Sequence, residues 1–121
     1  MKEIRVLVVD DDDRFRWRLA QYLATVPDIE MVGEVASGQE ALLSAGALKP
    51  DLVLMDVRMP GMNGVTATRL LKEELPNLKV IVLSVYDLKE YKDAALASGA
   101  SAYVIKKGMT EELIPAIRNV L

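Results

Sequence analysis

Short runs of apolar residues alternate along the chain with longer segments in which apolar positions recur every three or four residues. The apolar runs cover residues 4–9, 31–35, 51–55, 79–84 and 102–105. Such runs predict buried strands, and the run at 31–35, which is shorter and more polar, predicts a strand at the sheet edge. The segments between them predict amphipathic helices. Five strand–helix units predict an α/β fold, a doubly wound parallel sheet with helices on both faces.

Capping residues indicate where several of these helices begin. Ser37 and Glu40 have the Ser-x-x-Glu form of a capping box, which predicts the start of a helix. Asp87 and Glu90 have a similar arrangement before an alanine-rich segment. The last helix is predicted to begin at about Glu111.

The first helix follows four consecutive aspartates, residues 10–13. Negative charge is favourable in a first helical turn, because it faces the positive end of the helix dipole. The apolar stripe of this helix extends from Phe15 to Val26, and Pro27 is predicted to close it. Three arginines predict a solvated face on the same helix: Arg14, Arg16 and Arg18.

Length and composition favour one domain, residues 1–121, with an ordinary hydrophobic core. Hydrophobic residues make up 51% of the chain and charged residues 27%, and the net charge of −3 argues against nucleic-acid binding by this chain alone. The sequence has neither a membrane-length apolar run nor a signal peptide, so we expect a cytoplasmic protein without a membrane anchor. Cysteine and histidine are both absent. Disulfides, thiolate or histidine metal ligands and Ser-His-Asp chemistry are therefore excluded.

Polar side chains stand where the predicted strands end. Asp10 and Asp11 follow the first strand, Asp56 follows the third, Ser84 ends the fourth and Lys106 follows the fifth. In an open parallel sheet, ligands bind beyond the carboxyl ends of the strands. We therefore expect these five side chains to converge at one edge of the sheet.

The chemistry of this set indicates a metal-assisted phosphoryl site. Crowded carboxylates resist ionisation unless a cation lies among them, and a set of oxygen ligands favours Mg²⁺. Three negative charges, on Asp10, Asp11 and Asp56, would be offset by Mg²⁺ and Lys106. A phosphoryl group fits here because metal, ammonium and hydroxyl would all face its oxygens. The inferred chemistry is nucleophilic attack by the Asp56 carboxylate to form an acyl phosphate.

Four motifs resemble those of a known family, in the right order and spacing. They lie at residues 8–11, 56–64, 83–84 and 103–106. Through them the whole chain resembles the receiver domain of two-component response regulators. The resemblance implies a flavodoxin-like (βα)5 fold with strand order 2-1-3-4-5. It also implies a signalling switch, not an enzyme, beyond self-catalysed phosphotransfer and autodephosphorylation.

The resemblance also implies roles for the residues of the acidic edge. Asp56 would be the phosphoacceptor. Asp11, assisted by Asp10, would bind Mg²⁺ together with Asp56 and the backbone carbonyl of Arg58.

Three further residues would respond to the phosphoryl group. Lys106 would bind it, Ser84 would be the switch hydroxyl and Tyr103 the switch aromatic. On phosphorylation, Tyr103 would repack inward and remodel the surface formed by the fourth helix, the fifth strand and the fifth helix.

Two departures from the common receiver pattern refine the resemblance. Lys107 and Gly108 follow the lysine where many receivers have proline, and this form looks like receivers of the NarL/FixJ type, which carry a LuxR-type DNA-binding domain. DNA would then be contacted only through such an output domain, outside this chain. Val85 stands where alanine is common, and its bulk would affect access to Asp56 or the dephosphorylation rate.

Partners follow from the same resemblance. Because the chain has no histidine, the phosphoryl group would come from a separate sensor histidine kinase or phosphotransfer protein. Phosphorylation is also expected to allow formation of a homodimer.

Other function classes share part of this pattern. A phosphohydrolase of the haloacid-dehalogenase type also uses an Asp nucleophile with Mg²⁺, but it needs a second acid two residues later, where this chain has Arg58. A flavodoxin-like cofactor binder is disfavoured because the four acids after the first strand would repel a phosphate. A P-loop nucleotide hydrolase is excluded by the absence of G-x-x-x-x-G-K-[ST].

Overall fold

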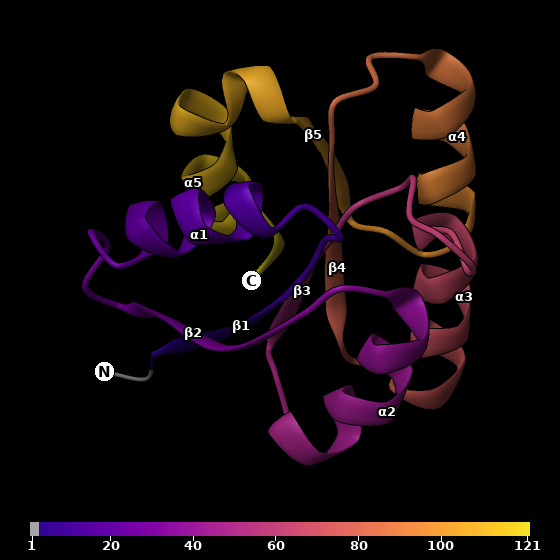
Figure 1. Ribbon diagram of the computed structural model, residues 1–121, viewed down its shortest axis with the longest axis horizontal. Helices are drawn as coiled ribbons and strands as arrows, with labels where there is room; N and C mark the ends of the chain where they lie inside the picture. Colours follow the sequence, from indigo (N-terminus) through magenta and orange to yellow (C-terminus); the bar gives the residue numbers. More distant parts are fainter. Residues whose placement is uncertain (1–2) are drawn as a thin grey trace.

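A parallel sheet runs through the centre of the molecule, with helices on both of its faces (Figure 1). The computed structural model describes residues 3–121. The five strands are β1 (Ile4–Val9), β2 (Ile29–Val35), β3 (Leu52–Met55), β4 (Lys79–Ser84) and β5 (Ala102–Ile105). Their order in the sheet is β2-β1-β3-β4-β5. The predicted flavodoxin-like fold, with the second strand at an edge, is confirmed.

Five α-helices connect and follow the strands. They are α1 (Asp13–Leu23), α2 (Gly38–Leu48), α3 (Gly64–Glu74), α4 (Lys89–Ala97) and α5 (Met109–Val120). A short 3-10 turn, η1 (Lys106–Gly108), precedes α5. In Figure 1, α1 and α5 lie on one side of the sheet, and α2, α3 and α4 on the other.

Successive residues of each central strand enter different cores, because side chains alternate across a strand. Val6 and Val8 of β1 pack with α1 and α5, whereas Leu7 and Val9 pack with α2 and α3. A third, smaller cluster beneath α4 contains Val57, Val82, Ala95 and Ala100, with Tyr91 and Tyr103 packed against it. Both faces of the sheet are thus buried, which explains the nearly continuous apolar runs.

The register of the strands brings their polar end residues together. Val9 of β1 pairs with Met55 of β3, and Met55 pairs with Val82 of β4. Asp10 and Asp56, one residue further along β1 and β3, therefore leave the sheet side by side. The Asp56 N–H donates to the Val9 carbonyl over 2.9 Å, which extends the pairing by one step.

The start of α3 closes tightly over the end of β3. A Cβ atom added at Gly64 would lie 1.8 Å from the carbonyl oxygen of Asp56. The Gly64 N–H donates to the Val57 carbonyl over 2.7 Å, and Asn63 caps the helix by accepting from the Thr66 N–H over 2.9 Å. Only glycine allows this approach.

Helix boundaries agree with the predictions in part. The capping box at Ser37 is confirmed, since its Oγ accepts from the Glu40 N–H over 3.1 Å. The box predicted at Asp87 is wrong: Leu88 occupies the N-cap position of α4, and Asp87 pairs with Lys92 over 2.5 Å. The spacing of Asp87 and Glu90 in the sequence did not show that Lys92 would bind the Asp87 carboxylate.

Two helix ends also differ from the predictions. The first helix ends at Leu23, before Val26, because the residue preceding Pro27 is disfavoured in helical conformation. The intervening residues form tight turns, and Val26 still packs against the core. The last helix begins at Met109, two residues before the predicted start, directly after η1.

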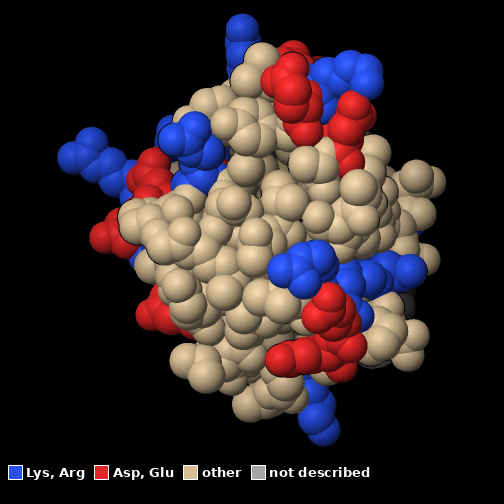
Figure 2. All heavy atoms as spheres, turned by 90° about the vertical axis from the view of Figure 1, so that its right-hand side faces the viewer, with Lys and Arg blue, Asp and Glu red and all other residues tan. Residues whose placement is uncertain are grey.

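The surface over α3 and α4 carries no single-sign stripe. Figure 2 shows this side, where acidic and basic side chains form mixed groups with uncharged surface between them. Within residues 3–121, no helix has both the length and the apolar character required to cross a membrane.

Two glycine-to-alanine substitutions test the close approach at Asp56. Gly64→Ala should lower the free energy of unfolding by roughly 1–3 kcal/mol, because backbone atoms must move apart. Gly46→Ala in α2 is the matched control: its added methyl would meet nothing within 4 Å. That change should stabilise the protein by about 0.5–1 kcal/mol through helix propensity. Denaturant unfolding measures both, and equal effects would contradict the steric argument.

Candidate functional site

Three aspartates form a cluster at the carboxyl edge of the sheet. Asp10 and Asp11 follow β1, and Asp56 follows β3. One carboxylate oxygen from each lies within 4.8 Å of the other two. Asp10 and Asp56 are 2% and 7% exposed, whereas Asp11 faces solvent. The structure thus brings together the three predicted acids, with Asp11 at the open side.

Lys106 balances part of this negative charge. Its Nζ lies 2.6 Å from Oδ2 of Asp10 and 3.8 Å from Oδ1 of Asp56. Lys106 follows β5, which is separated from β3 and Asp56 by β4. Its side chain nevertheless reaches the acids and is only 13% exposed. The predicted convergence of Lys106 with the acids is therefore present.

Backbone N–H groups hold two of the carboxylates in place. Oδ1 of Asp10 accepts from the Asp12 N–H over 2.9 Å, and Oδ1 of Asp56 accepts from the Val57 N–H over 3.0 Å. Asp12 in turn caps α1. The acids are thus fixed by the loops that follow their own strands.

The protonation of Asp56 reflects its surroundings. Burial, followed by the negative charge of Asp10, raises the pKa of Asp56 from 3.8 to about 7, even though Lys106 opposes the shift. Near neutral pH the carboxyl group is consequently shared between protonated and ionised forms. A cation among the three acids would favour the ionised, nucleophilic form.

The hydroxyl groups of Ser84 and Tyr103 both form hydrogen bonds with the main chain of Tyr86. The buried Ser84 hydroxyl accepts from the Tyr86 N–H over 3.1 Å, and the Tyr103 hydroxyl donates to the Tyr86 carbonyl over 2.7 Å. Burial is the main cause that raises the pKa of Tyr103, so its hydroxyl stays protonated and able to donate. The two predicted switch residues thus share the main chain of Tyr86.

The Arg58 side chain joins the loop after β3 to α4. Its Nη1 lies 3.3 Å from the hydroxyl of Tyr91, and its guanidinium carbon lies 5.7 Å from the ring centroid of Tyr86. The two tyrosine rings are themselves 5.2 Å apart. The predicted role of the Arg58 backbone carbonyl as a metal ligand stays a prediction.

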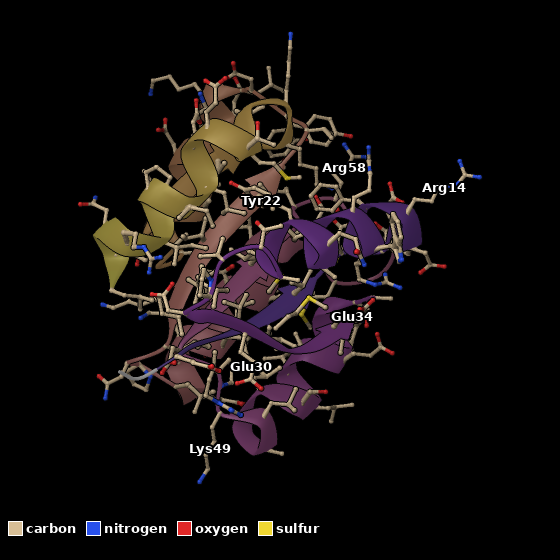
Figure 3. All side chains as sticks on the ribbon, turned by 90° about the vertical axis from the view of Figure 1, so that its left-hand side faces the viewer. Arg14, Tyr22, Glu30, Glu34, Lys49 and Arg58 are labelled. Carbon is tan, nitrogen blue, oxygen red and sulfur yellow. The ribbon has the colours of Figure 1, made fainter. Side chains whose placement is uncertain are left out.

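The prediction that Arg14, Arg16 and Arg18 form a solvated face is wrong for Arg16. Arg14 extends into solvent (Figure 3) and Arg18 is exposed, but the side chain of Arg16 is only 12% exposed. Arg16 pairs with Glu34 of β2 over 2.9 Å, and also bonds Asp13 and the Asp10 carbonyl. It therefore anchors the helix start beside the acid cluster.

Sequence reasoning missed several contributors to the site. Phe15 was assigned only to the apolar stripe of α1, yet its ring contacts the Lys106 ammonium at 4.0 Å from the centroid. Tyr86 and Tyr91 carried no motif signal. The motif at residues 56–64 includes Gly64, but the sequence did not reveal that this glycine lies against the carbonyl of Asp56.

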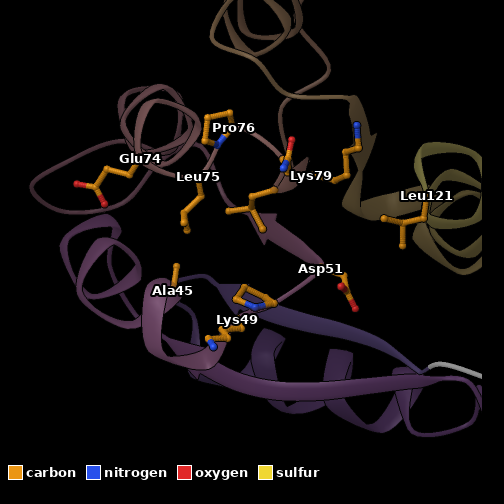
Figure 4. A pocket seen from close by; sticks show the side chains of 12 residues that line it. Ala45, Lys49, Asp51, Glu74, Leu75, Pro76, Lys79 and Leu121 are labelled. Carbon is orange, nitrogen blue, oxygen red and sulfur yellow. The ribbon is translucent and has the colours of Figure 1, made fainter.

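A separate cavity lies at the opposite end of the sheet (Figure 4). It measures about 450 Å³ and is lined by loop and strand-start residues, among them Lys49, Asp51, Leu75, Lys79 and Leu121. The three acids and Lys106 are not part of its lining. It is thus distinct from the acidic edge.

Comparison with known proteins decides the family. The family model for the response regulator receiver domain matches residues 6–118. The chain belongs to this receiver family. The receiver is 44% identical over 118 residues to the response regulator protein VraR of Staphylococcus aureus, covering 96% of the chain and 56% of VraR. It spans little more than half of that relative.

Solved structures agree with this assignment. The signal receiver domain of NarL from Mycobacterium tuberculosis superposes with a TM-score of 0.91 at 31% identity, covering 99% of this receiver and 97% of that chain. A LuxR-family response regulator from Aurantimonas gives a TM-score of 0.94 at 28% identity, covering 98% and 85%. The resemblance to NarL-type receivers is confirmed.

Family membership also separates the function classes considered above. A receiver is a signalling domain, not a catalytic enzyme, so the haloacid-dehalogenase alternative is not favoured. The side chain of Arg58, at the position where that enzyme class needs an acid, is bound to Tyr91.

The raised pKa of Asp56 predicts a pH-dependent stability. The folded state binds more protons than the unfolded state between pH 3.8 and about 7, so the free energy of unfolding should fall as pH rises through this interval. Asp56→Asn removes the titrating group. Without divalent cations, the variant should be about 2–4 kcal/mol more stable than the wild type at pH ~8 and nearly equal to it at pH ~4.

Urea unfolding across this pH range measures the difference. Asp93→Asn, the same change on the exposed face of α4 outside the acid cluster, is the matched control. A constant offset between wild type and Asp56→Asn at every pH would contradict the assigned pKa.

Proposed function

We propose that residues 1–121 form a phosphorylation-dependent switch that accepts a phosphoryl group on Asp56 and signals through the surface of α4, β5 and α5. The observation that supports this most directly is the acid cluster, with its oxygens within 4.8 Å and the Lys106 ammonium 3.8 Å from Asp56. Receiver membership gives the proposal its signalling context.

The transfer step needs an ionised Asp56. One carboxylate oxygen attacks phosphorus, and the new O–P bond forms as the bond from phosphorus to the leaving group breaks. The leaving group retains the electron pair: it is an imidazole nitrogen of a phosphohistidine donor or acetate from acetyl phosphate. Lys106 would compensate charge on the phosphoryl oxygens. Hydrolysis of the resulting acyl phosphate would end the signal.

The donor atoms fit Mg²⁺. Carboxylate oxygens of Asp10, Asp11 and Asp56, with the Arg58 carbonyl, would hold the ion, and solvent could reach it beside the exposed Asp11. When bound, Mg²⁺ supplies charge neutralisation for the phosphoryl oxygens.

Output would begin at Ser84. A hydroxyl drawn toward the phosphoryl group would release the Tyr86 N–H, and Tyr86 also accepts the hydrogen bond from Tyr103. Repacking of Tyr103 and of α4 would then shift the population between two surface arrangements.

The partners proposed are a sensor histidine kinase or phosphotransfer protein as donor and a second copy of this chain after phosphorylation. The similarity to a DNA-binding response regulator of the LuxR family from Staphylococcus aureus supports control of transcription through a DNA-binding output domain.

Acetyl phosphate labelling tests the acceptor. With Mg²⁺, the wild type should gain one phosphoryl group, which is labile to base because it is an acyl phosphate. Asp56→Asn should gain none, and Asp93→Asn should behave as the wild type. Intact-mass spectrometry measures the adduct; equal labelling of Asp56→Asn would exclude Asp56.

The same assay separates metal binding from acceptor loss. Asp11→Ala should require at least about tenfold more Mg²⁺ for half-maximal labelling, since it removes a ligand. Asp93→Ala, which removes one exposed charge on α4 outside the acid cluster, is the control. Equal Mg²⁺ requirements in the two variants would remove Asp11 from the site.

The proposed output coupling is tested with Ser84→Ala. This variant should still be labelled at Asp56, but the amide shifts that phosphorylation produces around Tyr91 and Tyr103 should shrink by more than half. Two-dimensional NMR of the phosphorylated protein measures these shifts. Wild-type shifts in Ser84→Ala would show that the hydroxyl does not transmit the signal.

A further inference from the structure

The ammonium of Lys106 lies between two unlike surfaces. On one side are the carboxylates of Asp10 and Asp56, at 2.6 and 3.8 Å. Also within contact range is the ring of Phe15, whose centroid is 4.0 Å from Nζ. Phe15 is 5% exposed and the lysine side chain 13%, so most of both side chains is removed from solvent, although both also line a surface pocket. A cation–π attraction is strongest under such desolvated conditions.

The ring differs from the carboxylates in one important respect. It attracts a cation without adding negative charge to a site that already holds three acids. The carboxylate partner of Lys106, Asp10, belongs to the candidate metal cluster. A divalent cation there would compete with the ammonium for the carboxylate of Asp10, whereas the ring would remain available.

We propose that Phe15 is a positioning residue for Lys106, holding the ammonium where it can meet a phosphoryl group on Asp56. This inference rests on the proposed function, because it assigns a role within the same site. Phe15 touches Lys106 and acts through it.

Hydrogen bonds at the start of α1 fix the position of the Phe15 backbone relative to Asp10. Asp12 caps α1, and its Oδ1 accepts from the Phe15 N–H over 3.1 Å. The Asp12 N–H in turn donates to Oδ1 of Asp10 over 2.9 Å. A short chain of hydrogen bonds therefore links the backbone that carries the ring to the acid that holds Lys106. On its other side, the ring packs into the core that includes Leu19 and Leu113.

A second cation lies near the ring but is placed differently. The guanidinium carbon of Arg18 is 6.0 Å from the Phe15 centroid, at the outer limit of such contacts, and Arg18 is exposed. Arg18→Ala should therefore leave phosphorylation unchanged, and it serves as the control for loss of a nearby positive charge.

The sequence allows a sharp test because Phe15 is the single phenylalanine of the chain. Replacing all phenylalanine by mono-, di- or trifluorinated phenylalanine alters one ring and weakens its negative face stepwise, with little change in volume. The initial rate of labelling by acetyl phosphate at saturating Mg²⁺ should fall with each added fluorine. The full decrease should be roughly 3- to 30-fold, set by the strength of a desolvated cation–π contact.

Repeating the fluorinated series in the Lys106→Ala variant tests whether the ring affects the labelling rate through Lys106. In that variant, fluorination should cause no further decrease, because the cation that the ring attracts is gone. The Mg²⁺ concentration for half-maximal labelling should stay constant across the fluorinated series. A stepwise decrease that persists in Lys106→Ala would overturn the proposal, as would a flat series in the wild-type background.

Conventional variants separate positioning from packing. Phe15→Leu should slow labelling as the trifluorinated ring does, and Phe15→Tyr should restore it. Leu19→Ala, a buried change on the same helix, should lower the melting temperature without this rate loss. Equal rates in Phe15→Leu and the wild type would overturn the proposal. Absence of any adduct on wild-type Asp56 would instead overturn the proposed function, so the two failures are distinguishable.

Discussion

The structure depends on the enclosure of like charges at one edge of its sheet. Asp10 and Asp56 are nearly buried, and their mutual repulsion contributes to the raised pKa of Asp56. Lys106 partly relieves that repulsion from a third strand, β5, with its Nζ 2.6 Å from Asp10. The other features surround the negative charge that remains: the backbone N–H groups of the loops, the ring of Phe15 and the tight start of α3. An edge of this kind favours any added cation that its oxygens can bind.

The fold could be predicted from the sequence almost completely. The runs at 4–9 and 52–55 had clear C-terminal ends, because buried apolar residues stop abruptly at Asp10 and Asp56. Helix ends were less predictable. Asp87 resembled a cap but pairs with Lys92, and Arg16 resembled a surface residue but bonds across to Glu34 of β2. In both pairs a long cationic side chain, Lys92 or Arg16, reaches a carboxylate that the local spacing does not identify.

Part of the candidate site could also be predicted from the sequence, and part could not. Asp10, Asp11, Asp56 and Lys106 were predictable because strand ends converge at a sheet edge. The contacts of Phe15, Tyr86 and Tyr91 were not, since each depends on the direction of a side chain or a loop. An apolar stripe predicts that Phe15 is buried, but it does not predict that an ammonium lies against its ring.

The connection between Ser84 and Tyr103 passes through the N–H and carbonyl of Tyr86, without using its side chain. Every residue except proline supplies these same two groups. Evolution can therefore vary the side chain at this position, and with it the contacts to Arg58 and Tyr91, while both hydrogen bonds are retained. The connection therefore needs only the two hydroxyls, on Ser84 and Tyr103, and the course of the backbone between β4 and α4.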